Sequence, residues 1–78
     1  MERLFSHYER REKDVLRILA GGGSIFGRAA GLLDLPRGAA QHARRSLLDD
    51  GDLITDNEGR YHVTDPFMAD WIRRNLPL

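Results

Sequence analysis

The chain has 78 residues, and its 12 basic side chains balance 12 acidic ones, so the formal net charge is zero. It has no cysteine, which excludes disulfides, thiolate catalysis and cysteine-ligated zinc. A chain this short buries only about 60–65% of its unfolded surface, too little to enclose a large active-site cavity. No apolar run approaches the length of a membrane span and no signal-peptide core is present. We therefore expect a cytoplasmic protein without membrane contact.

The first helix is predicted over residues 7–20, after a lead-in of residues 1–6. The sequence leaves open whether this lead-in is ordered through Leu4 and Phe5, or is disordered or extraneous to the domain. Ser6 is expected to cap this helix, with Glu9 completing a capping box three residues later. Leu16 is expected at the edge of the apolar stripe. The side chains expected to face the core share helical spacing: Tyr8, Val15, Ile18 and Leu19.

A second, short helix is predicted over residues 25–33, after the glycine run 21–23 and with Ser24 as its cap. No Gly-Lys-Ser/Thr follows the glycines, so they do not form a nucleotide-binding P-loop. Gly27 and Gly31 are expected to let another helix approach closely. The apolar positions of this helix are Ile25, Phe26, Ala29, Ala30, Leu32 and Leu33.

The third helix is predicted over residues 37–50, with Pro36 at its start and Gly51 at its end. Directly after it, two short apolar segments, 53–55 and 61–64, bracket a turn that contains Asn and Gly, which is typical of a β-hairpin. The helix residues expected to face the core are Ala40, Ala43 and Leu47, with Leu48 at the edge.

The last helix is predicted over residues 66–75, capped by Thr64 or Asp65, and its side chains Phe67, Trp71 and Met68 are expected to pack across the first helix. This order of elements predicts a single domain, residues 1–78, that is mainly α with a small hairpin. The predicted fold is a winged helix-turn-helix with a three-helix core, a two-stranded wing and an extra C-terminal helix.

The outer face of the third helix is the candidate nucleic-acid site. Between Pro36 and Leu48 there are three arginines and no acidic residue. Arginine can pair with guanine edges, glutamine with adenine edges, and both can hold phosphate. An ordinary solvated helix face would show the same residues, and the sequence leaves both interpretations open. The residues assigned to double-stranded DNA are Arg37, Gln41, His42, Arg44 and Arg45.

The hairpin and its flanks favour a different partner, because acidic side chains surround the single Arg60 there. A wing that grips DNA normally offers lysine or arginine to the phosphates. An alternative function is therefore a protein-interaction module, which would form a homodimer or dock on another domain. The residues assigned to such a surface are Asp49, Asp50, Asp52, Phe67 and Trp71, and the hairpin acids Asp56 and Glu58 add to its charge.

Catalysis and metal binding have little support in the sequence. The carboxylates at 49–52 lack the spacing of a calcium loop, and the three histidines are isolated from one another. No zinc-protease motif, nucleophile elbow or Walker lysine is present. We expect no enzyme activity, no metal and no cofactor.

Several segments together resemble a known family. They are Leu35-Pro36-Arg37-Gly38, the run 44–51, Gly59-Arg60-Tyr61 and the closing run 65–74 with its Asp-Pro-Phe and Trp-Ile-Arg-Arg. Their order resembles the winged-helix domain that follows the ATPase core in archaeal-type ATPases of the AAA+/STAND group, including bacterial relatives. The resemblance implies a non-catalytic accessory domain that binds DNA or packs against an upstream ATPase domain. It places no ATP-binding residue in this chain.

Overall fold

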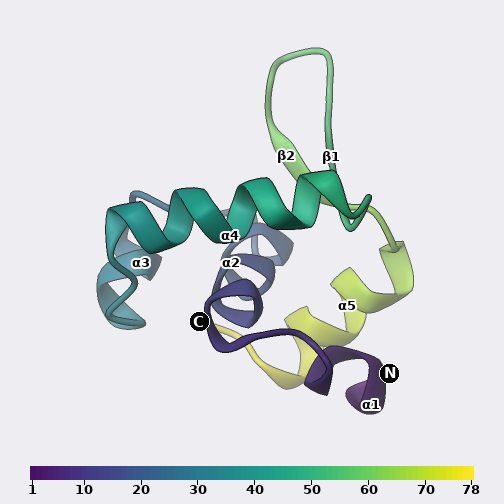
Figure 1. Ribbon diagram of the computed structural model, residues 1–78. Coiled ribbons are helices and arrows are strands. Elements are labelled where there is room, and N and C mark those ends of the chain that lie inside the picture. Colours follow the sequence, from purple (N-terminus) through teal and green to yellow (C-terminus); the bar gives the residue numbers. More distant parts are fainter.

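Helix α2 (Arg10–Ala20) lies at the centre of the computed structural model, which describes all 78 residues (Figure 1). Helix α4 crosses it on one side, α5 packs on the other, and α3 lies next to the N-terminal end of α4. The remaining elements, in chain order, are α1 (Glu2–Ser6), α3 (Arg28–Leu32), α4 (Arg37–Asp49), β1 (Leu53–Thr55), β2 (Tyr61–Val63) and α5 (Pro66–Asn75).

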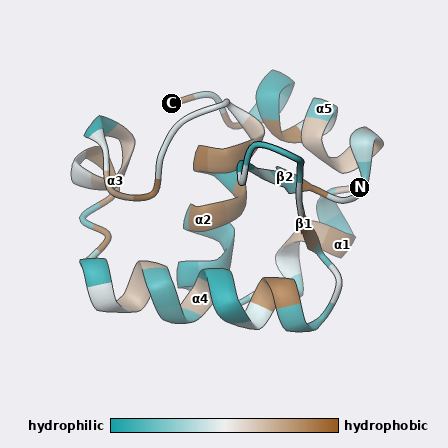
Figure 2. Cartoon of the chain, turned by 90° about the horizontal axis from the view of Figure 1, so that it is seen from above, coloured by the Kyte–Doolittle hydropathy of each residue, from teal (hydrophilic) through white to brown (hydrophobic).

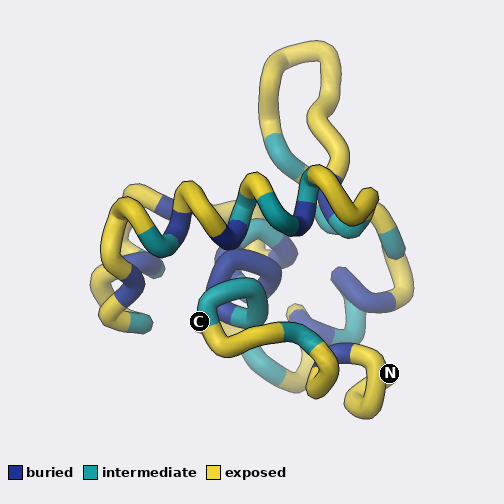
Figure 3. Tube along the Cα trace, in the orientation of Figure 1, coloured by how far each residue is buried: buried dark blue, intermediate teal, exposed yellow.

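The hydrophobic core follows from this central position of α2. Figure 2 shows apolar residues on the turns of α2 between its neighbours, and Figure 3 shows the same turns buried. Because α4 and α5 cover opposite sides of α2, the buried stripe is wide. It includes Leu16, which is fully buried, whereas Leu19 is only half-buried, the reverse of the expected order. The largest fully buried side chains are Val15, Leu16, Ile18, Leu47, Leu53 and Ile72.

Helix α2 begins later than the sequence suggested, and Ser6 does not cap it. Glu9 takes that position, and its backbone N–H donates to the Glu12 carboxylate at 3.0 Å, the reciprocal bond of a capping box. The Ser6 hydroxyl instead donates to the carbonyl of Arg3, within the preceding helix. The capping box therefore exists, but it is displaced by three residues.

The expected lead-in is an ordered helix, α1. Its Phe5 is buried, and the Phe5 ring lies 5.7 Å from the Trp71 ring and 6.5 Å from the Tyr8 ring, between centroids. Aromatic pairs at these separations in tilted arrangements are favourable. Of the two alternatives for the lead-in, the structure has the ordered one, because the buried Phe5 closes the core beneath α5.

Helix α3 is also shorter than predicted, since it starts at Arg28 with Gly27 before it. The Ser24 hydroxyl accepts a hydrogen bond from the backbone N–H of Phe26 at 3.2 Å, so Ser24 shapes a turn rather than a helix cap. Phe26 is 42% exposed and therefore lies outside the core, and Leu32 is exposed as well. A side chain at Gly31 would meet nothing within 4 Å, so the expected close helix approach does not occur there.

Helix α4 and the hairpin follow the sequence prediction closely. Ala40, Ala43 and Leu47 are buried, and Gly51 ends the helix with a φ of +80°, a conformation that favours glycine. Strands β1 and β2 pair antiparallel, with Leu53 opposite Val63 and Thr55 opposite Tyr61. The hairpin rises beyond α4 as an exposed projection (Figures 1 and 3).

The carboxylate of Asp65 caps α5, accepting hydrogen bonds from the backbone of Phe67 at 2.9 Å and of Met68 at 3.4 Å. Met68 and Ile72 are buried, and Trp71 is half-buried against Phe5. Phe67, expected in the core, is 76% exposed, because the core-facing side of α5 is set by Met68 and Ile72 one residue further round the helix.

The chain is mainly helical with a two-stranded antiparallel hairpin, an arrangement compatible with a winged helix. Its longest helix has 13 residues, so none is of the length and apolarity that would cross a bilayer.

Candidate nucleic-acid interface

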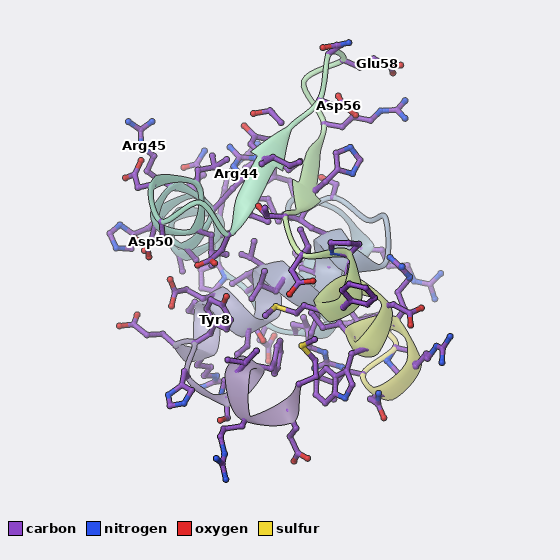
Figure 4. All side chains as sticks on the ribbon, turned by 90° about the vertical axis from the view of Figure 1, so that its right-hand side faces the viewer. Tyr8, Arg44, Arg45, Asp50, Asp56 and Glu58 are labelled. Atoms are coloured by element: carbon purple, nitrogen blue, oxygen red, sulfur yellow. The ribbon has the colours of Figure 1, made fainter.

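The face of α4 opposite the core is formed by the polar residues that the sequence assigned to DNA. Gln41, His42 and Arg45 are all exposed on it. Figure 4 shows Arg45 pointing away from the molecule. The guanidinium of Arg45 lies 3.4 Å from the carboxylate of Asp49, one turn along the helix, and both side chains are largely exposed. Such a surface pair contributes little and opens readily.

Arg37 and Arg44 lie on one flank of α4, where aromatic rings hold them. The Arg37 guanidinium lies 4.6 Å from the centre of the Phe26 ring, and that of Arg44 lies 5.5 Å from the same centre. Arg44 also lies 4.3 Å from the centre of the Tyr61 ring, on strand β2. Cations at these distances are attracted by the ring quadrupole. The turn before α3, the flank of α4 and the first residue of strand β2 therefore meet around these two guanidinium groups.

Neither Arg37 nor Arg44 forms an ion pair with a carboxylate, and the same holds for Arg28 at the start of α3. Attraction to an aromatic ring orients a guanidinium without neutralising its charge. Arg37 and Arg44 are therefore oriented by rings and keep a free charge, whereas Arg28 contacts no ring. We call Arg37 and Arg44, together with Phe26 and Tyr61, the arginine–aromatic cluster.

The sequence placed Arg37 and Arg44 on the flanks of the helix but did not find their aromatic supports. Phe26 was interpreted as a core residue, and Tyr61 as part of the hairpin only. One signal was present for Tyr61: strand alternation puts it on the same side as Val63, which packs against the core. No comparable signal singles out Phe26, because its exposure depends on where α3 starts.

The charges of the hairpin are largely engaged within the hairpin itself. The Asp56 carboxylate accepts hydrogen bonds from the backbone N–H groups of Glu58 and Arg60, and it lies 2.7 Å from Nε2 of His62. The bond to His62, followed by that from the Arg60 backbone, lowers the pKa of Asp56 to about 2. Figure 4 shows Glu58 at the tip of the hairpin, and the Glu58 carboxylate and the Arg60 guanidinium form an exposed pair at 3.4 Å. Asp56 thus organises the turn.

The other acidic residues gather at the opposite end of α4. Asp49 and Asp50 are exposed there, whereas Asp52 is half-buried. Burial, the charge of Asp52 and a hydrogen bond with Asp52 together raise the pKa of the Tyr8 hydroxyl to about 12, with smaller contributions from the charges of Glu12 and Asp65. The molecule therefore has an acidic end, formed by α2, α4 and α5 near Tyr8, and a basic end at the arginine–aromatic cluster.

The residues assigned to a protein-interaction surface do not have equivalent environments. Phe67 is exposed, whereas Trp71 is packed against Phe5, which makes Trp71 part of the structural core. No three histidine or acidic side chains lie close enough together to hold a metal ion.

Comparisons of the chain with protein-family models, with curated proteins and with solved structures give no match. The resemblance to the ATPase-associated winged helices therefore rests on the sequence segments that suggested it.

Proposed function

We propose that this chain is a winged helix-turn-helix domain that binds double-stranded DNA, with α4 in the major groove and the hairpin as the wing. In this proposal it is a non-catalytic accessory domain of an AAA-type ATPase, and any nucleotide chemistry belongs to an upstream domain. The observation that carries the proposal is the pair Arg37 and Arg44, held by Phe26 and Tyr61 without a carboxylate partner.

The dimensions of α4 suit the groove. Its 13 residues form a rod about 20 Å long, and a major groove about 12 Å wide admits one helix. The exposed Gln41 and Arg45 would face base edges, while Arg37 and Arg44 on the flank would meet phosphates. The hairpin rises beside the exposed face of α4 (Figure 1), so DNA seated on that face would pass next to it.

The acidic residues of the hairpin are compatible with this arrangement, because their carboxylates already have partners within the hairpin. Asp56 is occupied by the turn and by His62, and Glu58 lies beside Arg60. Breaking the exposed pair would free Arg60 for a phosphate at small cost. Glu58 at the tip would then need to point away from the duplex.

The test is a titration of the isotope-labelled domain with a short random-sequence duplex at low salt, observed through the backbone amide resonances. We expect shifts at residues 37–45 and at Tyr61, which added salt removes, because phosphate contacts release counterions. No shifts in these segments at high micromolar DNA would refute DNA binding by the isolated domain.

The second candidate function is the protein-interaction module, which would dock on the ATPase core of a parent chain or form a homodimer. The observation that favours it is the exposure of Phe67, at 76%, because an aromatic side chain at the surface adds apolar area to any contact made there. A contact at Phe67, on α5, would leave the residues of α4 assigned to DNA free, so one function does not exclude the other.

A further inference from the structure

We propose that the cleft between the turn 21–25 and strand β2 binds a single phosphate group, through the backbone N–H groups of Ser24 and Ile25 and the guanidinium of Arg44. Two sources present such a group: the DNA backbone, as a diester, and a small free molecule, as a monoester. The site itself does not depend on DNA binding, whereas its occupation by a DNA phosphate rests on the proposed function.

The cleft has a volume of about 430 Å³, which is within the range of sites for small molecules. Three parts of the chain line it: the turn that follows α2, the flank of α4 and strand β2. Leu19 and Ile25 supply apolar surface, and Tyr61 supplies an aromatic ring. No acidic residue lines the cleft. An anion that enters it therefore meets hydrogen-bond donors and apolar groups without a carboxylate among them.

The course of the turn is fixed by the end of α2. The backbone N–H groups of Gly22 and Gly23 donate to the carbonyls of Leu19 and Ile18, at 3.1 and 2.9 Å. Gly22 has a φ of +81°, and a side chain on Gly23 would come within 3.3 Å of the Ile18 side chain. These glycines therefore hold the backbone closely against α2 as it enters the cleft.

The next two residues of the turn have free backbone donors. The N–H groups of Ser24 and Ile25 have no acceptor in the chain. Ile25 is only 3% exposed, and N–H groups in buried segments nearly always have an acceptor, which is water or a ligand where the chain supplies none. Successive N–H groups in a turn are a common way to bind an anion. Both residues line the cleft, so an anion in it is a suitable acceptor.

The cation of the site is Arg44. Its guanidinium lies 4.3 Å from the centre of the Tyr61 ring and has no carboxylate partner. Figure 4 shows Arg44 beside the hairpin. Guanidinium groups bind phosphate through charge-assisted hydrogen bonds, and a group that is already oriented loses less conformational freedom on binding. Because this cation comes from α4 and not from the glycine turn itself, the site has no P-loop motif in the sequence.

Two further basic side chains line the cleft, Arg60 and His62. Each has a carboxylate partner in the hairpin, since Glu58 lies 3.4 Å from Arg60 and Asp56 lies 2.7 Å from His62. The pair of Arg60 and Glu58 is exposed on both sides, so it opens readily and Arg60 can turn to a phosphate. The free charge of Arg44 and the two N–H groups carry the proposal, and Arg60 adds to them.

The first experiment titrates the isotope-labelled domain with inorganic phosphate at pH 7.5 and constant ionic strength, with chloride as the reference anion. We expect saturable shifts of the amide resonances of Ser24 and Ile25 and of the Arg44 side-chain N–H. The dissociation constant should be on the order of 1–10 mM, because the site offers only a few charge-assisted hydrogen bonds. No saturable shift at tens of millimolar phosphate, or shifts spread equally over all arginines, would overturn the proposal.

Arg44→Ala and Arg37→Ala form a matched pair of variants. Both remove one unpaired guanidinium from α4, and alanine has a higher helix propensity than arginine, so both are expected to fold. Arg37 does not line this cleft. Arg44→Ala should weaken phosphate binding about tenfold, as the loss of a hydrogen bond to a charged group does, and Arg37→Ala should leave it unchanged. Equal effects of the two variants would refute a site at Arg44.

Two small esters identify the source of the phosphate. Methyl phosphate is a monoester and is mostly doubly charged at pH 7.5, whereas dimethyl phosphate is a diester with the single charge of a DNA phosphate. Shifts with methyl phosphate alone assign the site to a free monoester, and equal shifts with both assign it to the DNA backbone. These titrations contain no DNA, so phosphate binding without duplex binding would refute only the proposed function. Duplex binding without any phosphate shift at Ser24 and Ile25 would refute only this site.

Discussion

The flank of α4 and the hairpin both carry arginines, but only the arginine of the hairpin is paired with a carboxylate. On the flank, Arg37 and Arg44 lie over aromatic rings and keep a free positive charge. In the hairpin, Arg60 lies next to Glu58 and the charge of Asp56 is used within the turn. Both regions belong to a chain of zero net charge. The pairing of each arginine with a nearby carboxylate, rather than the total charge of the chain, therefore decides where the surface keeps a free positive charge for an anionic partner.

The largest expected effect of a substitution is a loss of stability in the core that supports both regions. Leu47 is fully buried and holds α4 on α2, so Leu47→Ala should lower the free energy of unfolding by about 2–5 kcal/mol. Denaturant titration measures this change. The matched control is Leu48→Ala, at the half-buried edge of the same helix, which should cost clearly less. Equal losses would contradict the assignment of Leu47 to the centre of the core.

A smaller effect, on DNA affinity, should test the role of the arginines on the flank of α4. Phe26→Ala removes the ring shared by Arg37 and Arg44, and each cation–ring contact is worth about 0.5–1 kcal/mol at an exposed site. DNA affinity should fall several-fold while the domain stays folded, because Phe26 lies outside the core. Fluorescence anisotropy with a labelled duplex measures this loss. Phe67→Ala provides the control, and an equal loss with it would contradict a specific role for the cluster.

Asp49→Asn should raise DNA affinity rather than lower it. It frees Arg45 from its exposed ion pair and removes a negative charge from the face of α4 that we propose meets DNA. Because exposed pairs are worth about 0–1 kcal/mol, the same anisotropy assay should show an increase in affinity of a few-fold at most. Asp70→Asn, which breaks the similar pair with Arg74 on α5, should leave DNA affinity unchanged. A decrease with Asp49→Asn would mean that the pair positions Arg45 for binding.

The smallest effect concerns the hairpin turn and its pH dependence. The pKa of Asp56 is lowered in the folded chain, so its stabilising contribution is present above its ordinary value of 3.8 and disappears as the pH falls towards about 2. Amide resonances of Glu58 and Arg60 should shift over this pH range, while those of Ala40 and Ala43, in a stretch of α4 without carboxylates, should change much less. Asp56→Asn should abolish the transition. A transition that persists in the variant would assign it to another group.

The sequence predicted the parts of the fold that depend on neighbours along the chain. Ala40, Ala43 and Leu47 recur at helical spacing, Gly51 ends α4, and Asp65 caps α5. These features arise from backbone geometry and local hydrogen bonds, which a short stretch of sequence determines.

The features that the sequence missed depend on residues far apart along the chain. Helix α1 was taken for a lead-in because its anchor, Phe5, finds its partner Trp71 only near the other end. The supports of Arg44 come from Phe26 and Tyr61, which lie in separate elements. In α5, Phe67 and Met68 both have suitable helical spacing, and tertiary packing alone selects which of them is buried.

The most direct test of the account measures DNA affinity against salt concentration for three proteins: wild type, Arg44→Ala and Arg74→Ala. Arg74 is an exposed arginine on α5 with a carboxylate partner, so it controls for the loss of one charge. For the wild type we predict a log–log slope of about −3 to −4, reduced by about 1 in Arg44→Ala and unchanged in Arg74→Ala. Equal slopes for all three proteins would contradict the claim that the arginine–aromatic cluster binds DNA phosphates.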